Sequence, residues 1–136
     1  MNRVILLVTL GLLSLTANAH DDHIGPMNGY VKHLGAAEVE LVTTDAGIVV
    51  HVRDEKTGKA ISLPSGSTGR AVVLSAGKTE SVTLAPANGV LTGTAKAAIP
   101  ANAKVALSLT IPGVEGIPST TFDLGKKSTL PKGLPQ

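Results

Sequence analysis

All four histidines of this 136-residue chain lie within its first 51 residues. His20 and His23 share one short segment with Asp22 and Met27, so imidazole, carboxylate and thioether donors occur close together in the sequence. Imidazole suits copper, zinc and nickel, and a thioether favours copper, Cu(I) in particular. The donor set therefore predicts a metal site with copper, as Cu(I) or Cu(II), as the expected ion and with zinc or nickel as alternatives.

The first 19 residues have the features of an export signal. Arg3 gives a positive start, residues 4–15 are mostly apolar, and a small-x-small cleavage pattern ends at Ala19. The apolar run is shorter than the roughly 20 residues that span a membrane, so we expect export without a membrane anchor after cleavage. Cleavage after Ala19 would give His20 a free α-amine, and this amine and imidazole could chelate one ion as part of a histidine brace.

His33 and His51 lie farther along the chain, in stretches with strand character. His33 belongs to residues 30–34, which could form a first strand, and His51 lies on the polar side of the alternating segment 48–53. Both are candidate ligands, and we expect His51 to contribute only if the N-terminal segment folds back across that face. Surface positions without a role are the alternative for both, and an unstructured tail is the alternative for the segment before them.

The elements that must position these residues are predicted to be β-strands. Period-two alternation, separated by turn signals rich in Gly, Pro and Asn, indicates strands near 37–41, 48–53, 71–74, 81–84, 90–94, 105–111 and 120–124. No predicted helix is long enough to connect parallel strands, so we expect an all-β fold, an antiparallel Ig-like β-sandwich of about seven or eight strands. This domain would cover 37–125, between a leader at 20–36 and a flexible tail at 126–136.

Glu38 and Glu40 alternate with apolar residues in the expected strand 37–41. Because successive side chains of a strand point to opposite faces, both carboxylates should lie on the same side, away from the core. We expect this side to face solvent and the two carboxylates to do no chemistry.

Composition excludes several classes of function. Lys and Arg number 12 against 10 for Asp and Glu, without a run of more than two basic residues, so no basic stripe for nucleic acid is present. Cysteine is absent, which excludes disulfides, thiolate nucleophiles and Cys-based metal sites. The common catalytic motifs are missing too, so we expect no enzyme, with oxygen activation by a histidine brace as the catalytic alternative.

Several motifs carry a family resemblance. They are the His/Asp/Met/Gly segment at 20–29, Glu-Leu-Val at 40–42, Val-His-Val-Arg-Asp at 50–54, Lys-Thr-Glu at 78–80, Leu-Ala-Pro-Ala-Asn-Gly at 84–89 and Ala-Lys-Val at 103–105. Together they resemble small periplasmic proteins associated with heavy-metal efflux systems of Gram-negative bacteria. In that group the leader commonly reads His-Gly-Gly, and this chain has Met27-Asn28-Gly29 at the matching place.

The resemblance implies a periplasmic location and a partner among the periplasmic components of a metal efflux system. A sandwich with an N-terminal histidine is also similar to the periplasmic copper carriers of the copper-resistance type, in which that histidine is a Cu(II) ligand. His20 maps onto this position, although the last third of the chain has no Asp-x-His motif.

We therefore predict a periplasmic metal-binding protein that buffers copper or delivers it to an efflux or resistance system. His20 and His23 should contribute more to the affinity than His33. The alternative is an Ig-like periplasmic interaction or assembly module, which would offer exposed edge strands for strand addition and whose histidines would be incidental.

Overall fold

A computed structural model describes residues 23–35, 37–114 and 119–129 of the chain. The strands are β1 (His23–Ile24), β2 (Tyr30–Leu34), β3 (Ala37–Thr43), β4 (Gly47–Asp54), β5 (Thr68–Ser75), β6 (Lys78–Ala87), β7 (Val90–Thr94), β8 (Lys104–Thr110) and β9 (Thr120–Asp123). A 3₁₀ helix, η1 (Leu124–Thr129), follows. The predicted all-β, antiparallel class is confirmed, and no helix in the described ranges is long and apolar enough to cross a membrane.

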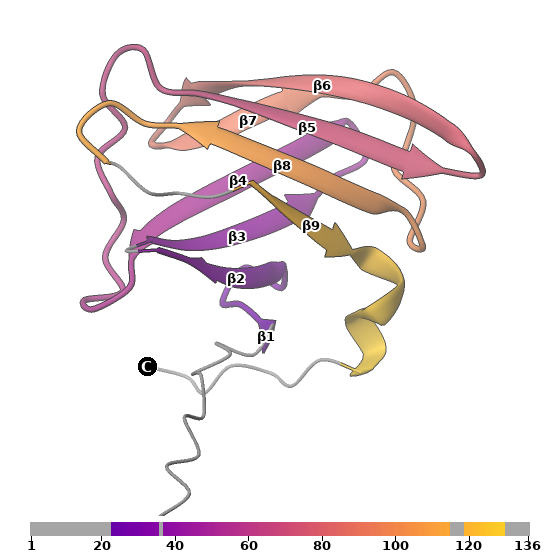
Figure 1. Cartoon of the computed structure of the whole chain (residues 1–136), viewed down its shortest axis with the longest axis horizontal. Coiled ribbons are helices and arrows are strands. Elements are labelled where there is room, and N and C mark those ends of the chain that lie inside the picture. Colours follow the sequence, from indigo (N-terminus) through magenta and orange to yellow (C-terminus); the bar gives the residue numbers. More distant parts are fainter. Residues whose placement is uncertain (1–22, 36, 115–118, 130–136) are drawn as a thin grey trace, which may run out of the picture.

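The strands form one curled sheet in the order β1-β2-β3-β4-β7-β6-β5-β8-β9 (Figure 1). The long strand β6 joins its two halves, because residues 78–84 pair with β5 and residues 85–87 pair with β7. Hydrogen bonding therefore continues where a sandwich of two stacked sheets would be interrupted. The sheet is closer to a half-barrel, with nine strands in the described part of the chain against the seven or eight expected.

The inner side of the curled sheet holds an aliphatic core. Its largest fully buried apolar side chains are Phe122, Leu41, Ile48, Leu84, Leu91, Leu107, Val39, Val50, Val82 and Val105. Each such side chain contributes about 1.5–3 kcal/mol when it leaves water. The apolar residues of the alternating segments thus fill the inside of the curled sheet.

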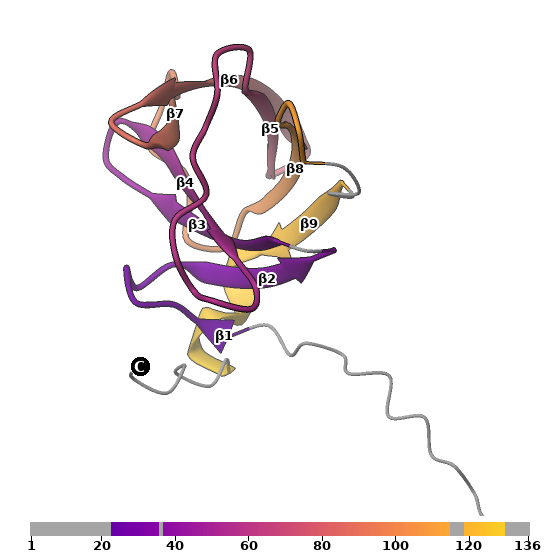
Figure 2. The same cartoon turned by 90° about the vertical axis from the view of Figure 1, so that its left-hand side faces the viewer.

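The curl brings β9 close to β2, although the two strands lie near opposite ends of the strand order (Figure 2). The Tyr30 hydroxyl on β2 donates a buried hydrogen bond of 2.7 Å to the carbonyl of Leu124, just after β9. On the same strand, the Lys32 ammonium lies 5.5 Å from the centroid of the Phe122 ring, a cation–π contact. Side chains thus hold β2 and β9 together where no strand ladder connects them.

The sheet starts earlier than the sequence suggested. In the described part of the chain its first strand begins at His23, inside the segment 20–36 that sequence analysis predicts to be a leader, because Ile24, Val31 and Leu34 are apolar enough to be buried. At the other end, η1 crosses the expected boundary between the domain and the tail at residue 125. The expected signal peptide at 1–19 lies outside the described residues, as does the tail from residue 130 onward.

Tyr30 gives a direct test of the closure between β2 and β9. Burial, and then the negative charge of Asp123, raise the pKa of Tyr30 above its ordinary value of 10.0. Because the pKa of Tyr30 is higher in the folded than in the unfolded protein, keeping the phenol protonated contributes to the free energy of unfolding. This contribution is present below pH 10.0 and is lost as the pH rises toward the folded pKa. Tyr30 is the chain's only tyrosine, so its phenolate absorbance should show a higher midpoint in the folded protein than in denaturant.

The matched variant is Tyr30→Phe, which removes the hydroxyl and keeps the ring. It should lower the free energy of unfolding near neutral pH by about 1 kcal/mol, through loss of the bond to Leu124. Equal phenol midpoints in folded and unfolded protein would contradict the buried position.

Candidate functional site

The outer face of β2, β3 and β4 gathers most of the polar side chains that sequence analysis singled out. Across the three strands, Val31 pairs with Glu40 and Glu40 with His51. One step along, His33 pairs with Glu38 and Glu38 with Arg53. Directly paired residues share a face of the sheet, so these two rows lie side by side.

Glu40 lies at the centre of this face and is fully buried, with 0% of its surface exposed. The connection between β1 and β2 folds over it, and the backbone N–H groups of Met27 and Gly29 donate to its Oε2 at 2.9 and 2.8 Å. The approach is close, because a Cβ added at Gly25 would lie 2.5 Å from the Glu40 Cδ. The expectation that Glu40 faces solvent is therefore wrong, since the chain itself covers this face.

Arg53 neutralises the buried carboxylate. Its Nη2 lies 2.9 Å from the Glu40 Oε1 and 2.8 Å from the Glu38 Oε1, so one guanidinium bridges both acids. Burial alone would lower the pKa of Arg53, but the hydrogen bonds and charges of the two carboxylates more than offset it and raise that pKa. The guanidinium stays charged, and Glu40 has partners for both oxygens.

His23 and His33 form a pair on the same outer face. Their ring centroids are 5.6 Å apart, with an angle of 34° between the ring planes. The register explains this contact: His23 pairs with Val31, and His33 lies two residues farther along β2 on the same side. The Nδ1 of His33 also lies 3.6 Å from the Glu55 Oε1, just beyond β4.

The other sequence candidates are placed differently. Met27 lies in the turn above Glu40 and exposes 53% of its surface. His51 lies on β4, and β3 separates this strand from β2, which carries His33. At the usual strand spacing, the Cα atoms of the two histidines are at least about 10 Å apart. The N-terminal connection does fold across this face, but it meets Glu40 with its backbone and does not bring His51 to the histidine pair.

The full predicted ligand set is not assembled in the described part of the chain. His20 and Asp22 lie outside the described residues. Among the residues that are described, no three His, Cys, Asp or Glu side chains group so that they could hold a metal ion. What the structure brings together is two imidazoles, with an exposed thioether in the connecting turn.

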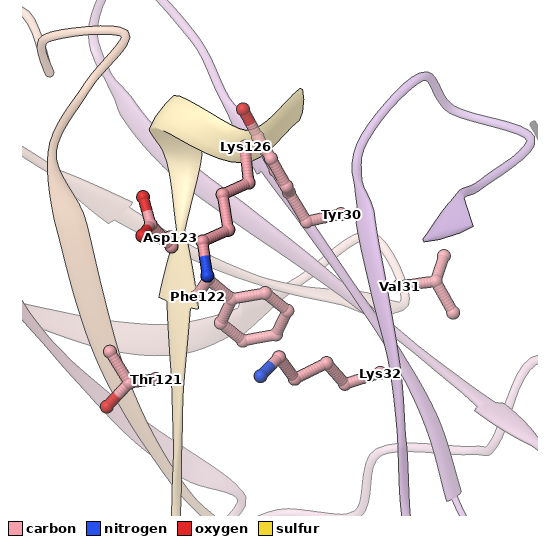
Figure 3. A pocket seen from close by; sticks show the side chains of 7 residues that line it. All are labelled: Tyr30, Val31, Lys32, Thr121, Phe122, Asp123 and Lys126. Atoms are coloured by element: carbon pink, nitrogen blue, oxygen red, sulfur yellow. The ribbon is translucent and has the colours of Figure 1, made fainter. Parts of the chain in front are cut away.

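The opposite face of β2 carries a small pocket of about 160 Å³ between β2 and β9 (Figure 3). Its lining residues are Tyr30, Val31, Lys32, Thr121, Phe122, Asp123 and Lys126. Typical small-molecule sites occupy about 300–1,000 Å³, so this hollow is smaller than an ordinary ligand site.

Sequence reasoning missed Glu40 and Arg53 as organisers of the outer face. The register of the hairpin between β3 and β4 could have placed Arg53 beside Glu38, because both lie on the polar side of their strands. Nothing in the local pattern indicated that the segment before β2 covers Glu40.

The chain matches no protein-family model, no curated protein and no solved structure. The chemistry available on the outer face is therefore the basis for assigning a function. Two neighbouring imidazoles suit a borderline metal ion, and a nearby thioether adds a preference for copper.

Proposed function

We propose that this protein binds copper through His23 and His33 and serves in the periplasm to buffer the ion or deliver it to an efflux system. The observation that carries this proposal is the 5.6 Å separation of the two ring centroids. Metal–imidazole bonds are about 2 Å long, so rings at this separation can turn one nitrogen each toward a common ion.

Two further features support the choice of ion. Met27 exposes its side chain in the turn between the two histidine-bearing strands, within the same small region of the fold. In the sequence, His20 and Asp22 come just before His23 and would add donors of the expected types. Imidazole and thioether together favour copper over the hard ions, which prefer oxygen ligands.

The pair also changes the expected ranking of the ligands. Sequence reasoning placed His20 and His23 ahead of His33, whereas the ring contact makes His23 and His33 equal partners in the proposal. Among the described residues, no histidine ring contacts His51, which therefore becomes the matched control.

The test is titration of the mature protein with Cu(II) and, separately, Cu(I). We expect His23→Ala and His33→Ala each to weaken binding of at least one ion by tenfold or more, because supporting groups alone change metal affinity by about 10–100-fold. His51→Ala should change it less than about twofold. A wild-type dissociation constant no tighter than millimolar for both ions would refute the proposal, as would unchanged affinity in both single variants.

A further inference from the structure

We propose that Glu40 is a positioning residue: its buried carboxylate holds the turn 25–29 on the outer face and thereby places His23 beside His33. As a part of the copper site, this role rests on the proposed function. The geometric part of the proposal can be tested without any metal.

The turn is a compact unit that is anchored on Glu40. Internally, the Gly25 N–H donates to the Gly29 carbonyl at 3.0 Å, and the Asn28 N–H donates to the Gly25 carbonyl at 2.9 Å. Externally, Met27 and Gly29 both donate to the same Glu40 oxygen, Oε2. Two backbone donors of the turn thus meet one carboxylate oxygen, which ties the turn to β3.

This turn sets where His23 lies. Gly25 directly follows β1, and Gly29 directly precedes β2, so the turn is the connection between the two strands that carry the histidines. β1 has only two residues, and the described ladder to β2 has only two residue pairs. Such a short pairing is weak by itself, and the anchored turn and the buried Ile24 add support to it.

A carboxylate is needed at residue 40 because both of its oxygens accept hydrogen bonds. Oε2 accepts from two backbone N–H groups, while Oε1 accepts from Arg53, so both ends of the group face donors. A glutamine has one oxygen and one NH₂ group, which only donates. Whichever way the amide of Glu40→Gln is turned, its NH₂ group would point at donors, either those of the turn or that of Arg53.

Glu38→Gln is the matched control. Glu38 accepts hydrogen bonds from the Nε and Nη2 groups of Arg53, both through Oε1. Its amide oxygen can therefore keep the contact with Arg53, and the half-buried residue can turn its NH₂ group toward solvent. The same chemical change at residue 38 should leave the turn in place.

The experiment compares the two variants first without metal. In Glu40→Gln, we expect the amide hydrogens of Met27 and Gly29 to exchange at least about tenfold faster than in the wild type, because local opening becomes easier. The nuclear Overhauser contact between the His23 and His33 rings should also be lost. In Glu38→Gln, both readouts should remain close to those of the wild type.

The second arm uses copper on the full mature chain. Glu40→Gln should weaken the affinity by about tenfold or more, as outer supports of metal ligands do. In a His23→Ala background the same change should have no further effect, because Glu40 acts through His23. A general loss of structure would instead weaken binding in both backgrounds.

The outcomes separate the two proposals. Unchanged amide exchange and an intact ring contact in Glu40→Gln would overturn the positioning role, whatever copper does. A weakened affinity that is the same with and without His23 would overturn it as well. If the wild type binds no copper, the proposed function fails, and loss of the ring contact in Glu40→Gln would still support the role of Glu40 in placing His23.

Discussion

Arg53→Met should lower the free energy of unfolding by about 3 kcal/mol, a large loss for a residue outside the aliphatic core. The side chain of Arg53 is only 13% exposed, and it bridges Glu38 and the fully buried Glu40. Methionine keeps most of the apolar stem but leaves the Glu40 charge without its cation. Removing one partner of a buried pair costs about 3–5 kcal/mol, and we expect the lower end because Glu40 keeps two N–H donors.

Urea denaturation of the metal-free protein measures this loss. Arg53→Lys is the informative companion, because lysine keeps the charge but lacks the planar fork that bridges two acids. It should fall between the wild type and Arg53→Met. Adding Glu40→Gln to Arg53→Met should cost less than the sum of the two single changes, since the charge that was left unpaired is then absent. A loss below about 1 kcal/mol in Arg53→Met would show that the buried pair does not stabilise the fold.

The strand positions were predictable because their signal is local. Apolar and polar residues alternate along β3 and β4, and most expected strands were found near their predicted places. Turn chemistry helped too: Asn88 and Gly89 connect β6 to β7 with φ of 53° and 81°, the positive values that this pair of residues tolerates. Neither signal requires knowledge of the rest of the chain.

The shape of the sheet was not predictable in the same way. Alternation shows that a strand has an inner and an outer side, but it does not show which neighbours the strand pairs with. β6 pairs with β5 along residues 78–84 and with β7 along 85–87, and this change of neighbour makes one curled sheet of what could have been two stacked sheets. Only the hydrogen-bonding partners of β6 decide between these arrangements.

The candidate site illustrates the same limit. Sequence reasoning found the donor types, but the contact between His23 and His33 depends on the register of a two-residue strand. Glu40 has the polar, outward position that the pattern predicted, yet it is buried because the turn 25–29 covers it. A pattern within one strand cannot reveal that a neighbouring segment covers its outer face.

Phe122→Ala should destabilise the protein by about 3–5 kcal/mol, the usual cost of emptying a buried aromatic site. Phe122 is the chain's only phenylalanine, and its surface is 1% exposed. It lies on β9, where it pairs with Val105 of β8. Its ring contacts the Lys32 ammonium of β2, and both residues line the small pocket between β2 and β9. Its removal should weaken the packing between β9 and β2, measured as a lower urea midpoint.

The same variant tests whether the two faces of β2 are independent. Lys32, which contacts Phe122, and His33, which contacts His23, are adjacent on β2 and therefore point to opposite sides of the sheet. Under conditions where Phe122→Ala remains folded, its copper affinity should stay within about twofold of the wild type, even though its stability loss matches or exceeds that of Arg53→Met. A tenfold loss of affinity in the folded variant would mean that the histidine pair depends on the closure with β9, and a stability loss below about 1.5 kcal/mol would mean that β9 adds little to the core.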